Sequence, residues 1–290
     1  MECTKQAILI TAYKDFDQLN ILIKTFNSNF LIYIHIDKKS VFTKDDKQKI
    51  MSHFNVKYIS QKYKVNWGGF NHLKAYLLLS EIALKDKVNT KFHLITGQDF
   101  PIKDTCFFQK LDNKDYLNFF KMPATCWTNG GMDRLEYYNF YDLFNAKKSM
   151  RWISLFVKLQ KKFKYKRSLN NYLGKLYGGS TYWSLSRETL QYVVRFTKEN
   201  KYFFNRFKYT FCPEEIYFQT IILNSKFSTN VVNDNLRFID WESGRGGNPA
   251  FLDETDLEKI LSSKSLFARK INMNHSSIIE LIKTQIHHKL

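Results

Sequence analysis

Hydrophobic and polar residues alternate in two different ways along the first hundred positions. Short continuous apolar runs, which are typical of strands buried on both faces of a sheet, cover residues 6–13, 30–36, 56–59 and 91–96. Between these runs apolar residues recur at helical spacing, which predicts helices at residues 15–26, 44–54 and 71–86. This order of elements predicts an α/β fold with a mostly parallel sheet flanked by helices.

The pattern is irregular between residues 123 and 177 and regular again beyond them. The later periodicity predicts strands at residues 182–185 and 231–239. It also predicts helices at residues 187–197, 214–224 and 253–263 and a final helix near Ile278. We interpret residues 1–290 as a single domain with three parts, residues 1–122, 123–177 and 178–290.

The charge of the chain is strongly positive. Lys and Arg number 45 against 27 Asp and Glu, a net charge of +18, which favours polyanionic partners such as nucleic acid, an anionic membrane or phosphorylated substrates. In the middle part, basic residues are interleaved with Trp152, Phe156, Phe163 and Tyr165. This segment is either a solvated helix packed by its aromatic side or a surface for an acceptor or anionic lipid. Motifs of nucleic-acid-binding folds are absent from the sequence, so we expect no nucleic acid partner.

The sequence also bears on the compartment. The longest apolar run, residues 75–84, is about half the length that a membrane-spanning helix needs. The first residues lack the features of a signal peptide. Cys3, Cys106, Cys126 and Cys212 have no paired spacing and are interpreted as reduced thiols. We expect a cytoplasmic protein, with peripheral contact at the inner face of the membrane as an option.

A series of segments, found together and in order, carries a more specific signal. They are residues 33–39 (YIHIDKK), 65–69 (VNWGG), 94–103 (LITGQDFPIK), 178–187 (GGSTYWSLSR), 212–215 (CPEE), 236–241 (LRFIDW) and 266–270 (LFARK). The series resembles the core-2/I-branching β-1,6-N-acetylglucosaminyltransferase family, which includes the peptide O-xylosyltransferases. The resemblance extends from about residue 6 to residue 271.

The resemblance implies a GT-A-type fold that transfers a sugar from a UDP-sugar with inversion, without a metal or other cofactor. Residues 1–122 would then form the nucleotide-binding half and residues 178–290 the catalytic half. The family's Pro-Asp-Glu segment reads Pro213-Glu214-Glu215 here, so the resemblance assigns the catalytic base to Glu215. It assigns the diphosphate to Arg237 and Lys270, with Arg269 beside them.

These residue types suit that chemistry. Inverting transfer needs one base for the acceptor hydroxyl, and Arg and Lys can neutralise the leaving diphosphate in place of a metal. Glu215 at a helix start has an alternative interpretation as a favourable charge at the helix dipole.

Further candidates come from the matched segments and from the ligand-binding edge of the sheet. Asp37, Gly97 and Asp99 lie at predicted strand ends, where such side chains contact the donor or cap turns. Trp67 and Trp183 are candidates for sugar-stacking walls, although aromatics of this kind also fill cores. The resemblance places Arg134 and Glu136 near the acceptor.

Several alternatives stay open. The animal members of the family have a membrane anchor, a stem and disulfides that this sequence lacks, so it resembles a bacterial member acting on a lipid-linked glycan of surface polysaccharide synthesis. We expect GlcNAc as the donor sugar, with xylose as the alternative and glucuronate not excluded.

Asp15 and Asp17 resemble a metal-binding acidic pair, although Asp15 also suits the cap of the next helix. From another class of function, a non-catalytic basic protein that binds nucleic acid or membrane remains.

Overall fold

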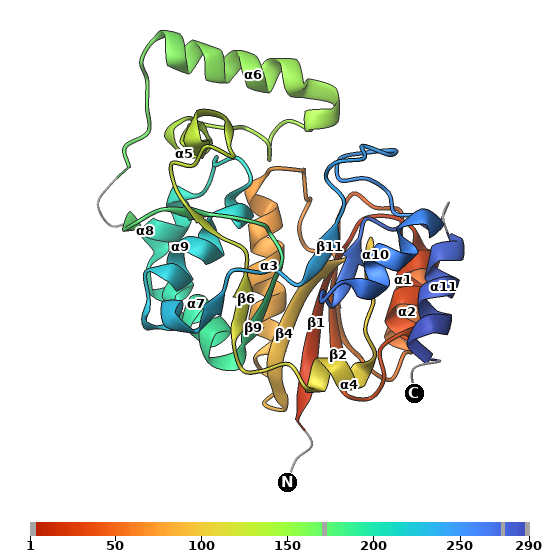
Figure 1. Cartoon of the computed structure of the whole chain (residues 1–290). Coiled ribbons are helices and arrows are strands. Elements are labelled where there is room, and N and C mark those ends of the chain that lie inside the picture. Colours follow the sequence, from red (N-terminus) through yellow and green to blue (C-terminus); the bar gives the residue numbers. More distant parts are fainter. Residues whose placement is uncertain (1–3, 170–172, 274–275, 288–290) are drawn as a thin grey trace.

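The computed structural model describes residues 4–169, 173–273 and 276–287. Its main sheet has the strand order β10-β6-β9-β4-β1-β2-β3 (Figure 1). The strands are β1 (Lys5–Ala12), β2 (Phe30–Ile36), β3 (Val56–Ser60), β4 (Asn89–Thr96), β6 (Asp115–Leu117), β9 (Trp183–Ser186) and β10 (Val231–Val232). Strands β1 to β4 are parallel to one another, whereas β9 is antiparallel to both β4 and β6. The structure confirms the predicted class, a mostly parallel sheet flanked by helices.

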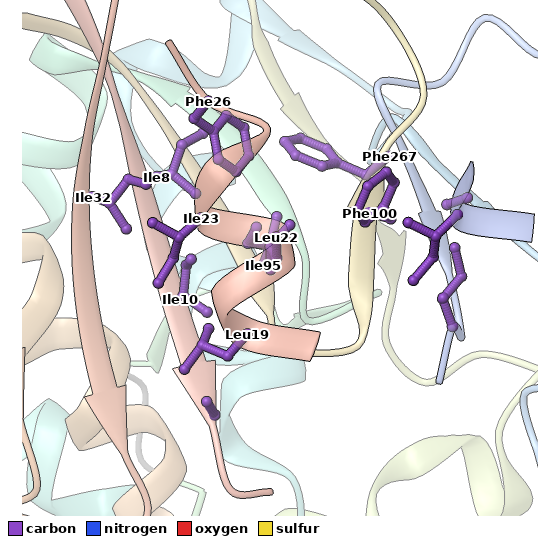
Figure 2. Close-up of a cluster of buried hydrophobic side chains, with 14 of the residues drawn as sticks. Ile8, Ile10, Leu19, Leu22, Ile23, Phe26, Ile32, Ile95, Phe100 and Phe267 are labelled. Atoms are coloured by element: carbon purple, nitrogen blue, oxygen red, sulfur yellow. The ribbon is translucent and has the colours of Figure 1, made fainter. Parts of the chain in front are cut away.

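Helices cover both faces of this sheet because successive residues of its buried strands point to opposite sides. Ile8 and Ile10 of β1 belong to one apolar cluster, and Ala7 and Leu9 belong to another. Figure 2 shows the first cluster, which includes Leu22. The helices on this side are α1 (Phe16–Lys24), α2 (Lys44–Met51), α10 (Leu257–Ser262) and α11 (Ser276–His287). Those on the other side are α3 (Phe70–Ala83), α7 (Arg187–Glu199), α8 (Lys201–Arg206) and α9 (Tyr217–Leu223).

A second, three-stranded sheet joins distant segments of the chain. It consists of β5 (Asp99–Pro101), β11 (Arg237–Ile239) and β12 (Phe267–Arg269), in the order β11-β12-β5. Strand β12 runs antiparallel to β5, and this register places Arg269 opposite Asp99. Three of the segments that carry the family resemblance therefore meet in this sheet.

Two predictions for the second half were wrong in detail. The strand predicted at residues 231–239 is two strands, β10 and β11, which lie in different sheets. A polar turn separates them, in which the Asp234 side chain accepts a hydrogen bond from the backbone of Leu236. The helix predicted at residues 214–224 is a 3-10 turn, η3 (Pro213–Glu215), followed by α9. The two are separate because the backbone at Ile216 is not helical.

The middle part contains more regular structure than its sequence pattern predicts. It includes α5 (Asp133–Glu136) and the seventeen-residue helix α6 (Ala146–Lys162), preceded by the 3-10 turn η1 (Thr128–Gly131). Strands β7 (Phe120–Lys121) and β8 (Tyr177–Gly178) pair where the chain leaves and rejoins the main body. Figure 1 shows α6 along the top of the view, with α5 between it and the sheet.

The remaining elements are short. They are α4 (Thr105–Gln109), η4 (Lys226–Asn230) and η5 (Glu254–Asp256). In the described ranges, every helix is too short or too polar to cross a bilayer. Cys106, Cys126 and Cys212 are free thiols, and Cys3 lies outside the described residues.

Candidate functional site

The strand order 3-2-1-4 places a change of winding direction between β1 and β4. Ligands of open parallel sheets bind outside the carboxyl ends of the strands at such a point. Here the Gly97 amide donates a hydrogen bond to the Thr11 carbonyl at 2.9 Å, and the Tyr13 hydroxyl donates to Gln98 Oε1 at 3.1 Å. Gly97 therefore forms part of the backbone of this edge.

Glu215 lies in the turn η3 and pairs with Arg134 of α5. Arg134 Nη1 donates to Glu215 Oε2 at 2.5 Å. The guanidinium carbon lies 3.5 Å from the ring centre of Trp127 and 5.1 Å from that of Phe211. A Cβ atom on Gly178 would approach Trp127 to 2.6 Å, so glycine is required beneath the tryptophan. The ion pair is thus held by aromatic rings as well as by its own hydrogen bond.

The environment of Glu215 makes its carboxyl group a better proton acceptor. Burial, and then the nearby charge of Glu214, raise the pKa of Glu215, while Arg134 lowers it. The side chain still has 29% of its surface exposed. A partly open carboxylate with a raised pKa is suited to general-base chemistry.

Glu214 begins a partly buried series of hydrogen bonds beside the base. Its Oε1 atom lies 3.2 Å from Nδ1 of His72, and Nε2 of His72 is 2.8 Å from the Tyr76 hydroxyl. The Thr181 hydroxyl donates to the Tyr76 oxygen at 3.3 Å. These hydrogen bonds were not predicted; the one sequence signal for them is the i, i+4 spacing of His72 and Tyr76 on α3.

A second group of charges surrounds Arg269. Its Nη1 atom bonds to Asp99 Oδ1 at 2.8 Å and to Thr96 Oγ1 at 3.0 Å. Its guanidinium carbon is 4.7 Å from the ring centre of Tyr182. Both Arg269 and Glu215 influence the pKa of Tyr182, which burial raises above its usual value. Tyr182, which is not among the residues predicted from the sequence, therefore packs beside Arg269.

Lys270 belongs to a cluster of cations. Its ammonium group lies 4.7 Å from the ring centre of Phe251, and within the described ranges it has no hydrogen bond or ion pair. Burial lowers the pKa of Lys270, as do the charges of Arg269, Lys14 and Lys147. Lys147 comes from the first turn of α6, so the insert contributes to this cluster. Gathered cations of this kind favour an anionic ligand.

Arg237, for which a diphosphate contact stays a prediction, bonds mainly to the main sheet in this structure. Its guanidinium is buried and donates to the carbonyl oxygens of Leu94 at 2.8 Å and Trp183 at 3.3 Å. The Ser184 hydroxyl accepts a further bond at 3.3 Å. Burial lowers the pKa of Arg237 to about 10. These bonds tie β11 to the main sheet, whereas the buried Nε atom has no hydrogen-bond partner among the described residues.

The other candidates divide between surface and interior. Trp67 is 60% exposed and packs edge-on against Phe211, so one side remains open. Trp183 is fully buried against Phe218, which favours the alternative interpretation of this ring as part of the core. Glu136 pairs with Lys166 at 2.7 Å and does not join Arg134 at Glu215.

Asp37, Asp15 and Asp17 have mainly local contacts. Asp37 Oδ1 accepts from the backbone amides of Lys39 and Val65, each at 3.0 Å, and so closes the turn after β2. Asp15 occupies the N-cap position of α1 without a side-chain cap bond and pairs with Lys14 at 3.2 Å. Asp17 lies in the first turn of the helix. Among the residues described, no three His, Cys, Asp or Glu side chains group as metal ligands.

Comparison with known proteins gives a consistent result. Residues 7–262 match the family model described as Core-2/I-Branching enzyme. Over 244 residues the chain is 25% identical to xylosyltransferase 2 of Rattus norvegicus, an alignment that covers 79% of this chain and 26% of the relative. Over 101 residues it is 31% identical to the β-glucuronosyltransferase GlcAT14A of Arabidopsis thaliana, covering 33% of this chain and 22% of the relative. The chain thus spans about a quarter of the length of these curated relatives.

Among solved structures, the chain is similar to S. aureus TarS 1-349, with a TM-score of 0.38 and 12% identity. The match covers 79% of this chain and 57% of the other. A glycosyltransferase involved in glycosylation of the major capsid of PBCV-1 matches with a TM-score of 0.36 and 9% identity, covering 96% of this chain and 99% of the other.

Proposed function

The chain belongs to the Core-2/I-Branching enzyme family, and from this premise we propose that it transfers a sugar from a UDP-sugar to a hydroxyl group of a glycan acceptor. The observation that carries the proposal is the presence of two complementary groups, a carboxylate held by Arg134 and a lysine that has no ion pair among the described residues. The carboxylate is that of Glu215, which is partly exposed and has a raised pKa, and the lysine is Lys270 in its cation cluster.

In the proposed reaction the acceptor oxygen attacks the anomeric carbon while the bond to UDP breaks, which inverts the configuration. Glu215 takes the proton from the attacking hydroxyl. Arg134 keeps the carboxylate oriented through its 2.5 Å hydrogen bond and its stacking on Trp127. A base held in this way reaches the transition state without reorganising.

The leaving diphosphate would be neutralised by the side chains of Lys270 and Lys14, and the neighbouring Arg269 would add positive charge. The unpaired ammonium group of Lys270 supports this assignment, since it can gain an anionic partner without losing one in the described part of the chain. Preorganised cations of this kind can replace a metal ion, so the proposed reaction is metal-independent. Arg237 acts as a buried support of this region.

For the donor we propose UDP-GlcNAc, with UDP-xylose as the second candidate because several relatives carry the name xylosyltransferase. The proposed acceptor is a lipid-linked glycan intermediate of bacterial surface polysaccharide synthesis. The protein would then work in the cytoplasm, at the inner face of the membrane. The basic insert supports an acceptor held at an anionic surface.

UDP release from a panel of UDP-sugars, measured in EDTA, tests this proposal. We expect slow hydrolysis of one donor by the wild-type protein, and a decrease of roughly a thousandfold in Glu215→Gln, because water loses its general base. Glu81→Gln, which alters an exposed ion pair far from η3, is the matched control and should keep the wild-type rate.

Isothermal titration with UDP completes the experiment. Full UDP binding by Glu215→Gln, together with its loss of hydrolysis, would place the residue in chemistry rather than in donor binding. Hydrolysis that appears only after Mn²⁺ is added would overturn the metal-independent reaction in favour of Asp15 and Asp17. A wild-type protein that neither binds UDP nor hydrolyses any donor would refute the transferase.

A further inference from the structure

Helix α6 exposes an apolar stripe that nothing in the described structure covers. The stripe is defined as Trp152, Leu155, Leu159 and Phe163, whose exposed fractions are 60%, 42%, 40% and 73%. The spacing i, i+3, i+7 and i+11 places these side chains on one face of the helix. An exposed row of large apolar residues is unusual for a surface helix and indicates a partner.

A neighbouring face of α6 attaches the helix to the domain. Ile153 is buried, and Gln160 exchanges hydrogen bonds with the backbone of Tyr138, at 2.8 Å from the amide and 3.0 Å to the carbonyl. Lys161 forms an ion pair with Asp133 of α5. The orientation of the helix is therefore fixed, and the stripe points away from the body.

Charge indicates the chemistry of the partner. Between Asp142 and Glu188 the chain has no acidic residue. Arg151, Lys158 and Lys162 lie beside the stripe on the helix, and in the described ranges their charged groups have no ion pair. A second copy of this chain would bring the same positive charge to the contact, whereas an anionic lipid surface offers both apolar chains and negative headgroups.

We propose that α6 binds in the interface of an anionic membrane, with the stripe inserted among the acyl chains and these basic residues at the headgroups. The proposal deepens the proposed function, on which its biological purpose rests, although the binding itself requires no turnover. The N-terminal turn of α6 carries Lys147 to the cation cluster, and Lys161 is paired with the helix that carries Arg134. A membrane-bound α6 therefore brings the site close to lipid-linked acceptors.

Co-sedimentation with vesicles tests this inference. Wild-type protein should bind vesicles of phosphatidylcholine containing phosphatidylglycerol, and bind phosphatidylcholine alone weakly. The triple variant Trp152→Ala, Leu155→Ala and Leu159→Ala should partition about tenfold less. Alanine preserves helix propensity, so far-ultraviolet circular dichroism should be unchanged. The matched control replaces three exposed apolar residues outside α6 with alanine, namely Val41, Phe54 and Tyr202.

A set of charge-reversal variants separates attraction to the lipid headgroups from insertion of the apolar stripe. Reversing Arg151, Lys158 and Lys162 to Glu should also lower binding about tenfold at low salt. Reversal of Lys57, Lys85 and Lys87, near the amino ends of β3 and β4, should have little effect. As a second measurement, lipids with brominated acyl chains should quench part of the tryptophan fluorescence, and Trp152→Phe should remove that part.

Equal partition of the wild-type protein and the stripe variant would overturn the inference, as would a lack of bromolipid quenching at Trp152. A dimer that dissociates in the stripe variant, without vesicle binding, would assign the stripe to a second copy instead. UDP release is measured without vesicles, so both variants should keep it. Failure of vesicle binding therefore leaves the transferase intact, and failure of UDP release leaves the membrane result intact.

Discussion

The two charged regions of the site are built in opposite ways. Around Glu215 each carboxylate has a polar partner, because Arg134 pairs with Glu215 and Glu214 Oε1 lies 3.2 Å from His72 Nδ1. Around Lys270 cations gather instead. Arg269 and Lys14 have their own carboxylate partners, whereas in the described part of the chain the ammonium group of Lys270 has none.

This difference indicates what each region does before a ligand binds. A matched pair fixes the position of a side chain, because separating the pair would leave a buried charge without a partner. A cation without an internal partner, beside other cations, attracts an anion and can pair with it without giving up another contact. The region of Glu215 is therefore suited to orienting the catalytic carboxylate, and the region of Lys270 is suited to binding a diphosphate.

Arg237 gives the largest expected effect on stability. It lies near the cation cluster, but its guanidinium is held by internal hydrogen bonds, as Glu215 is held by Arg134. Arg237→Met would leave the carbonyl oxygens of Leu94 and Trp183 without their donors in the interior. We expect the free energy of unfolding to fall by about 3 kcal/mol, measured by urea denaturation. Arg195→Met, on the exposed side of α7, should change it by no more than about 0.5 kcal/mol.

The opposite result would assign Arg237 to the proposed diphosphate site. If Arg237→Met kept wild-type stability and instead lost affinity for UDP, its guanidinium would contact the diphosphate. The assignment of Arg237 to the diphosphate, which the family resemblance implies, would then hold. Its hydrogen bonds to the sheet would have to be replaced by bonds to the diphosphate when UDP binds.

Substitution of Lys270 gives the second largest effect, a loss of affinity for UDP, and tests the proposed diphosphate site around Lys270 directly. Lys270→Met keeps the length of the side chain and removes its charge. We expect affinity for UDP to fall about tenfold, with unchanged stability, because the ammonium group loses no internal partner among the described residues. Isothermal titration with UDP measures this, with the exposed Lys264→Met as control. Wild-type affinity in Lys270→Met would remove the lysine from the proposed diphosphate site.

The sequence predicted the sheet better than the site, for physical reasons. Strand β2 matches its predicted range because a run buried on both faces needs no information from elsewhere in the chain. Arg237 shows the opposite case, since its residue type does not reveal that carbonyl oxygens of two other strands surround it. The approach of Lys147 to Lys270 depends on how α6 packs, so periodicity could not predict it.

The smallest predicted effect concerns the pH dependence of UDP release, where two variants at the base should act in opposite directions. Glu215 is active as a base only when ionised, so the rate increases as pH rises through its pKa. Glu214 raises that pKa and Arg134 lowers it. Glu214→Gln should therefore move the acid limb of the rate profile to lower pH, and Arg134→Gln should move it to higher pH, each relative to Glu81→Gln. Opposite shifts would confirm that the matched charges tune the base, whereas limbs that stay in place would assign them a purely structural role.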